Sequence, residues 1–166
     1  MLCNISFVSI ILTLLTLLPI TNMADKGTQQ LIFKDGLSDP SIVQRHENDV
    51  NDVNSVAKSD RISIEYAVID LNLDDLLDQV VIISSPLHSG SAGDSVYIYV
   101  NENGSEYRQI GTFVFQVHDQ DTSALVAQFF VSHQLKGGYR NIIIRQYTRE
   151  IELEYEDGKY HVKLPE

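Results

Sequence analysis

The sequence contains very little cysteine and no tryptophan. Its one cysteine, Cys3, lies inside an apolar N-terminal run. The rest of the chain therefore has no disulfide, no thiolate nucleophile and no cysteine ligand for a metal. A glycosidase needs a deep cleft lined with aromatic side chains, and the lack of tryptophan argues against that class.

Basic residues are also scarce. The chain has 12 Lys and Arg against 23 Asp and Glu, which gives a net charge of −11. Such an acidic protein repels phosphate backbones and anionic lipid surfaces, so we expect no nucleic-acid partner and, once a signal has been cleaved, no membrane partner. Cations are natural ligands of this surface, although the charge also serves simply to keep an exported protein soluble.

The N-terminal run predicts export. Residues 2–20 carry no charge, are interrupted by Pro19 and precede a polar stretch. This layout predicts a signal peptide at residues 1–24, cleaved after Ala24, and a periplasmic or secreted protein. Because no Lys or Arg precedes the apolar run, two alternatives stay open: an uncleaved N-terminal anchor, or translation that starts at Met23 and leaves the protein in the cytosol.

The remaining length, 166 − 24 = 142 residues, suits one domain. Residues 25–38 are polar and mixed, which predicts a lead-in segment before a single β-rich domain at residues 39–166. At its start, Asp39 suits a helix N-cap and Pro40 the first helical position, and apolar residues follow at helical spacing as far as Ala57. We expect this helix to lay its apolar stripe on a sheet.

Strand patterns fill the rest of the domain. Segments rich in Val, Ile, Tyr and Phe predict strands at residues 62–69, 79–84, 95–101, 107–117, 125–132, 139–147, 150–155 and 160–164. Asn-Gly and Asp-Gly pairs between them mark tight turns, which favour antiparallel neighbours. The expected fold is mostly β: an antiparallel meander or small sandwich with one N-terminal helix packed on a face. Alternation in several strands predicts one buried and one solvated face.

One loop has residue types and spacing that suit a cation. Residues 70–78 (DLNLDDLLD) place side-chain oxygens at loop positions 1, 3, 5 and 9, and a backbone carbonyl is available at position 7. The candidate ligands are Asp70, Asn72, Asp74, Leu76 and Asp78. Oxygen ligands of this kind suit Ca²⁺, with an affinity of about 10⁻⁴ to 10⁻³ M for an extracellular module.

An acidic turn that binds no metal is the alternative for residues 70–78. In it, Asp70 and Asp74 cap backbone amides. Calcium loops of this kind usually carry glycine at positions 4 and 6, where this sequence has Leu73 and Asp75. Aspartate tolerates left-handed backbone geometry better than most residues, at some energetic cost. Both interpretations remain open from the sequence.

Residues 70–83 (DLNLDDLLDQVVII) resemble the calcium-loop signature of FG-GAP and VCBS-type repeats, as found in integrin α-chain propellers. A longer stretch, about residues 66–144, resembles uncharacterised periplasmic proteins of Gram-negative bacteria, with a glycine turn at residues 90–93 and Gly-Tyr-Arg-Asn at residues 138–141. The resemblance implies a β fold and an extracytoplasmic site. Relatives often flank the glycine turn with two cysteines, where this chain has Ser89 and Asp94. A single copy cannot close a propeller.

No catalytic constellation emerges from the sequence. Ser91 lies beside a glycine and His88 is near, but the surrounding residues do not form a nucleophile elbow. We therefore expect an exported, non-enzymatic binding or interaction domain, which calcium stabilises if residues 70–78 bind the ion. We expect the domain to be monomeric and to have an unidentified protein or glycan partner. Two alternatives stay open: an extracytoplasmic hydrolase that uses Ser91 or the acidic loop, and an inhibitor of a foreign hydrolase.

Overall fold

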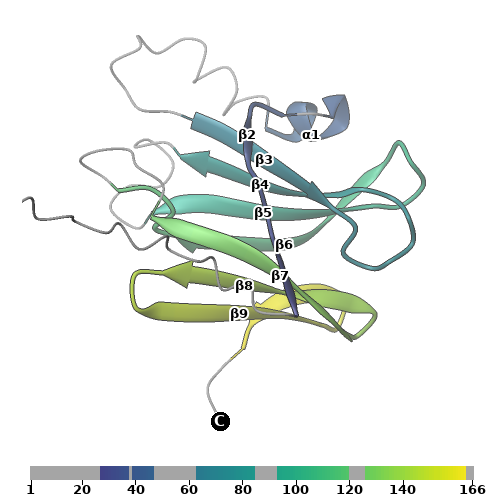
Figure 1. Ribbon diagram of the computed structural model, residues 1–166. Coiled ribbons are helices and arrows are strands. Elements are labelled where there is room, and N and C mark those ends of the chain that lie inside the picture. Colours follow the sequence, from purple (N-terminus) through teal and green to yellow (C-terminus); the bar gives the residue numbers. More distant parts are fainter. Residues whose placement is uncertain (1–26, 38, 47–62, 85–92, 120–125, 164–166) are drawn as a thin grey trace, which may run out of the picture.

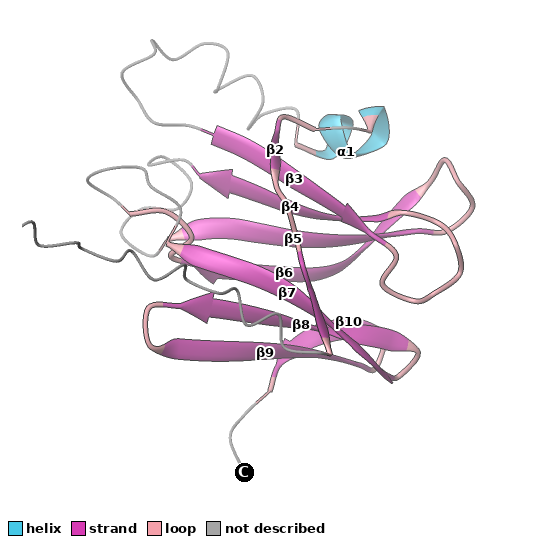
Figure 2. Cartoon of the chain, in the orientation of Figure 1, coloured by secondary structure: helices cyan, strands magenta, loops and turns pink. Residues whose placement is uncertain are grey.

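The computed structural model describes residues 27–37, 39–46, 63–84, 93–119 and 126–163. Within these residues the chain forms two five-stranded antiparallel sheets and one short helix, as Figures 1 and 2 show. The expectation of a mostly β fold is confirmed. The predicted signal peptide lies outside the described residues, as does most of the predicted helix. Within the described part of the chain, no helix is long and apolar enough to cross a membrane.

The two sheets follow the chain almost in order. The first sheet contains β2 (Lys34–Asp35), β3 (Ser63–Ile69), β4 (Asp78–Ser84), β5 (Asp94–Asn101) and β6 (Tyr107–Phe115). The second sheet contains β1 (Thr28–Gln30), β7 (Ala127–Lys136), β8 (Tyr139–Gln146), β9 (Arg149–Glu156) and β10 (Lys159–Val162). From β3 to β6 and from β7 to β10, each strand pairs with the next one along the chain. The eight predicted strands are all present with shifted ends, whereas β1 and β2, inside the lead-in segment, were not predicted.

Turn chemistry fixes the hairpins as expected. Between β9 and β10, Asp157 and Gly158 have φ of 51° and 87°, and the flanking residues Glu156 and Lys159 pair across the turn. Positive φ at both central residues matches the right-handed twist of the two strands. Gly104, between β5 and β6, also has a positive φ, of 90°.

The main core lies between the two sheets. Alternate residues of the first sheet meet alternate residues of the second, and the buried cluster includes Val80, Ile82, Val96, Ile98, Phe129, Val131, Ile142 and Leu153. Phe33, which follows β1, packs edge-on against Phe129 with ring centroids 5.2 Å apart. Burial of this apolar area is the main stabilising contribution to the fold.

A second apolar cluster covers the other face of the first sheet. It contains Ile42 of α1 (Pro40–Arg45) together with Ile64, Val81, Ile83, Tyr99 and Tyr107. Both faces of β4 are consequently buried, and Tyr99 of β5 is fully buried. The solvated face expected from alternation is therefore wrong for β5. It is right for β9, where Leu153 is buried in the core and Glu150 is exposed.

The helix begins where the sequence predicts. Asp39 Oδ1 accepts a hydrogen bond from Ser41 N at 2.8 Å, and Pro40 occupies the first helical position. The Arg45 guanidinium donates to the carbonyl oxygen of Tyr107 on β6 at 2.7 Å. Residues 47–62 lie outside the described part of the chain, so the extension to Ala57 and its packing on a sheet stay predictions.

Candidate functional site

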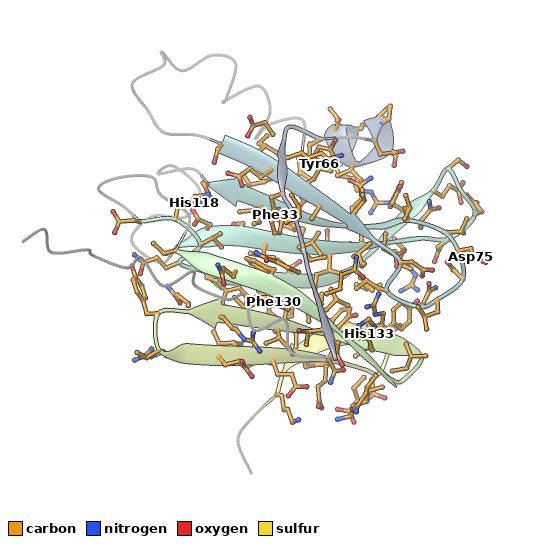
Figure 3. All side chains as sticks on the ribbon, viewed as in Figure 1. Phe33, Tyr66, Asp75, His118, Phe130 and His133 are labelled. Atoms are coloured by element: carbon orange, nitrogen blue, oxygen red, sulfur yellow. The ribbon has the colours of Figure 1, made fainter. Side chains whose placement is uncertain are left out.

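The acidic loop, residues 70–78, connects β3 to β4 at one end of the first sheet. Ile69 pairs with Asp78 across the last position of the ladder, and the chain between them projects beyond the strands. Leu71 is fully buried and holds the loop to the core, whereas Leu73 and Leu77 are exposed. Figure 3 labels Asp75 in this projecting loop.

The carboxylate of Asp70 organises the loop backbone. Its Oδ1 accepts hydrogen bonds from Leu73 N at 2.7 Å and Asp74 N at 3.2 Å, and its Oδ2 accepts one from Asp75 N at 3.0 Å. Three consecutive amides thus point at one side chain. The carboxylate thereby accepts hydrogen bonds from loop N–H groups that have no partner in the strand ladder.

Leu73 and Asp75 adopt left-handed backbone conformations, with φ of 60° and 66°. These are loop positions 4 and 6, where the FG-GAP-like signature carries glycine. A left-handed conformation costs a residue with a side chain about 1 to 2 kcal/mol. The backbone therefore adopts at both positions the conformation that glycine favours, although the sequence supplies none.

Asn72 and Asp74 lie against each other within the loop. Asn72 Nδ2 donates to Asp74 Oδ2 at 2.7 Å, and Asp74 Oδ1 accepts from Leu76 N at 2.9 Å. Asn72 Oδ1 is buried and has no hydrogen-bond partner within the described residues. A buried acceptor without a donor is costly, so this oxygen is available to a further partner.

Asp78 has a different position from the other acidic residues. It is fully buried, its Oδ2 accepts from Leu71 N at 2.8 Å, and its Oδ1 accepts from Asn101 N at the end of β5 at 2.8 Å. Burial raises the pKa of Asp78 to about 6, although the two backbone hydrogen bonds act in the opposite direction. Asp78 joins the base of the loop to the neighbouring hairpin.

Arg140 of β8 connects the loop to the second sheet. Its backbone N donates to Leu71 O at 2.8 Å, and its Nη1 donates to Asp70 O at 3.2 Å. The buried guanidinium also donates from Nε to Ser132 O at 2.7 Å. The sequence drew attention to Arg140 only through the resemblance of residues 138–141. The role of Arg140 depends on its contact with Asp70, which lies 70 residues earlier in the chain.

The candidate ligands therefore separate into two groups. Asp70, Asn72 and Asp74 are linked by hydrogen bonds within the loop, while Asp78 is buried at its base. No cluster of three or more His, Cys, Asp or Glu side chains suited to a metal ion occurs in the described ranges. The orphaned amide oxygen of Asn72 is nevertheless the hard, neutral type of donor that Ca²⁺ accepts beside carboxylates.

A charged cluster at the other end of the first sheet was not predicted. His118 Nε2 lies 3.0 Å from Glu65 Oε1, and its Nδ1 lies 3.2 Å from Asp94 Oδ2 and 2.9 Å from Ser84 Oγ. The side chains of His118, Glu65 and Asp94 are only 13, 18 and 12% exposed. Figure 3 shows His118 far from Asp75, across the length of the sheet.

Hydrogen bonds shift the pKa values of His118 and Asp94 in this cluster. Hydrogen bonds to Asp94 and Glu65 raise the pKa of His118 to about 9, against the effect of burial. Burial opposes ionisation of Asp94, but hydrogen bonds from His118 and Ser84 outweigh it and lower the pKa of the carboxyl. A carboxylate at each ring nitrogen favours the imidazolium form of His118.

The remaining sequence-based candidates lie elsewhere. Ser91 and His88, which the hydrolase alternative would use, lie outside the described residues. Comparison with known proteins finds no matching family model, no matching curated protein and no matching solved structure. The likeness of residues 70–83 to FG-GAP and VCBS-type repeats consequently stays a prediction.

Proposed function

We propose that this protein is an exported, non-enzymatic interaction domain whose acidic loop binds Ca²⁺. The observation that carries the proposal is the loop backbone, in which Leu73 and Asp75 hold left-handed conformations at the two positions where calcium loops use glycine. Strained conformations of this kind persist where the surrounding structure requires them and concentrate at functional sites. A cation that draws the loop oxygens together would offset that strain.

The ligands we assign are Asp70, Asn72, Asp74 and the carbonyl of Leu76. Asn72 Oδ1, which lacks a hydrogen-bond partner within the described residues, contributes a neutral oxygen. Asp70 and Asp74 contribute charge, because their hydrogen bonds to backbone amides leave further lone pairs for a cation. Asp78, assigned to the same set from its spacing, would act by holding the base of the loop through Leu71 and Asn101.

The compartment decides whether the loop is filled. Export, predicted from residues 1–24, would expose it to an extracytoplasmic calcium supply, whereas translation from Met23 would leave a weak site empty in the cytosol. At a free Ca²⁺ concentration about ten times the dissociation constant, binding stabilises the folded state by about 1.4 kcal/mol. We include in this proposal a helix that continues to Ala57 and covers the outer face of the first sheet.

Thermal unfolding in calcium and in EGTA tests the loop. We expect millimolar Ca²⁺ to raise the melting temperature of the wild-type protein by a few degrees, in line with about 1 kcal/mol for a domain of this size. Asp74→Asn should abolish the calcium-dependent increment while leaving most of the stability in EGTA. Asp157→Asn is the control, because Asp157 is likewise an exposed turn aspartate but lies outside the acidic loop.

Two results would overturn the proposal. If Ca²⁺ leaves the melting temperature unchanged, or raises it equally in Asp74→Asn and wild type, the loop is a metal-free turn capped by Asp70. Covalent labelling by a fluorophosphonate probe, or turnover of simple esters that a Ser91→Ala variant lacks, would contradict the non-enzymatic part and favour the hydrolase alternative.

A further inference from the structure

The four edges of the two sheets differ in how they are protected. β2 consists of only two residues, both of them charged, and β1 consists of only three residues. β10 has four and includes Lys159 and His161. Short strands and charged side chains are the usual means by which a protein prevents its sheet edges from pairing with other chains. Three of the four edges use them.

The fourth edge, β6, is less protected, because its one charged residue, Arg108, lies near its start. The strand is nine residues long and hydrogen-bonds only to β5 among the described strands. β10 of the second sheet approaches β6 without pairing to it, and its four residues are too few to cover the full strand. A register shift opposite Ile98 and Tyr99 interrupts the ladder early in β6, and regular pairing resumes from Gly111 to Phe115.

The chemistry of this edge differs from that of the rest of the molecule. Residues 109–115 (QIGTFVF) of β6 contain no ionisable side chain and no proline, in a chain with a net charge of −11. Thr112 is exposed and Val114 is 51% exposed, while Phe113 and Phe115 are stacked and turned toward the core. From Gln109 onward β6 is uncharged and has high β propensity, and an edge strand of this kind is a template for strand addition.

We propose that two copies of this chain associate through β6, which pairs with itself as antiparallel strands and joins the two first sheets into one ten-stranded sheet, 5 + 5. Charge favours a second copy over another partner. A different protein that bound this acidic chain would gain affinity from basic side chains placed against acidic ones, and this edge has no acidic side chain to offer. Two acidic copies repel each other elsewhere, so contact is least costly where ionisable groups are missing.

The geometry of self-pairing is closed. Antiparallel pairing centred on Phe113 places Val114 of each copy opposite Thr112 of the other, a pair of β-branched residues on the outer face. The contact is isologous, so each copy uses the same edge and no unpaired β6 remains to extend the assembly. This proposal departs from the monomer expected from the sequence and does not depend on calcium binding.

Sedimentation velocity on the wild-type protein, from about 1 to about 200 µM, measures the association. We expect a monomer–dimer equilibrium that strengthens as salt is added, because salt screens the repulsion between the acidic copies. Val114→Glu should raise the dissociation constant at least about tenfold, since each copy then brings a carboxylate to the dyad. Val162→Glu is the control, because Val162 is similarly exposed, 43%, on the edge strand β10.

Mixing charge variants tests the register. Val114→Lys alone should also weaken the dimer, and an equimolar mixture of Val114→Lys and Val114→Glu should restore it as a heterodimer, because the diagonal side chains then carry opposite charges. Far-UV circular dichroism checks that each variant is folded. If a variant does not fold, the salt dependence of wild-type association tests the dimer instead. A monomer at all concentrations, equal constants for Val114→Glu and Val162→Glu, or an unrestored mixture would overturn the proposal.

Discussion

Replacement of His118 by glutamine tests whether the charged cluster stabilises the fold. The variant keeps a hydrogen-bonding side chain of similar length but removes the positive charge. Glu65 and Asp94 would then lie mostly buried without their cation, and Asp94 would retain its backbone donors, Val117 N at 2.9 Å and His118 N at 2.8 Å. We expect the free energy of unfolding to decrease, because a buried charge that loses its partner is costly.

The magnitude follows from the pKa of His118, which is raised from 6.5 to about 9. One pH unit of difference corresponds to about 1.4 kcal/mol, so the upper limit is about 3 kcal/mol. The remaining solvent exposure of the three side chains screens the charges and reduces the expected contribution to about 1 to 2 kcal/mol. A pKa raised on folding means that the stabilisation is complete below pH 6.5 and is lost as the pH rises through 9.

Urea unfolding of wild type and His118→Gln at pH 6 and at pH 9.5 measures this difference. We expect the variant to be less stable by about 1 to 2 kcal/mol at pH 6 and by almost nothing at pH 9.5. His161→Gln, an exposed position on β10, is the control for the loss of an imidazole. A difference that is the same at both pH values, or is missing at pH 6, would refute the assignment of an ionised cluster.

Three further substitutions test the backbone and the loop. Gly93→Ala should lower the free energy of unfolding by at least about 3 kcal/mol, because Gly93 has a φ of 120° and an added Cβ would lie 2.6 Å from the backbone of Phe115; Gly27→Ala, with nothing within 4 Å, should change urea unfolding little. Asp75→Gly should raise the melting temperature in EGTA by relieving about 1 kcal/mol of strain, and calorimetry should show tighter Ca²⁺ binding if the proposed function is right; an unchanged melting temperature would contradict the strain argument. Arg140→Lys should lower the free energy of unfolding by about 2 kcal/mol, because lysine cannot reproduce the divergent hydrogen bonds of the guanidinium; equal stability in urea would show that those bonds contribute nothing net.

Local signals explain which parts of the fold could be predicted. Runs of β-branched and aromatic residues between glycine-containing turns located all eight longer strands, because strand propensity and turn geometry depend on neighbouring residues. β1 and β2 were missed since Thr28–Gln30 and Lys34–Asp35 are too short to show alternation, and they are strands only through pairing with β7 and β3. Burial of Tyr99 was missed because its contacts with Ile42 and His46 are long-range.

In the candidate site, too, local interactions could be predicted from the sequence and long-range ones could not. Asp70 caps amides three to five residues ahead, and that interaction was foreseen as the metal-free alternative because it is local. The position of Asp78 was not foreseen, because one of its partners, Asn101, is 23 residues away and belongs to another hairpin. The His118 cluster gathers residues from four separate segments, and no spacing rule could bring Glu65, Ser84 and Asp94 to one imidazole.

The two ends of the first sheet are held by polar links that suit a chain without disulfides. At one end Asp78 joins the acidic loop to the β5–β6 hairpin, and Arg140 joins that loop to the second sheet. At the other end, the carboxylate of Asp94 lies 3.2 Å from His118 Nδ1 and accepts hydrogen bonds from two backbone amides. Stability should therefore be insensitive to a reducing agent such as dithiothreitol yet sensitive to alkaline pH, a combination that a disulfide at the same place would reverse.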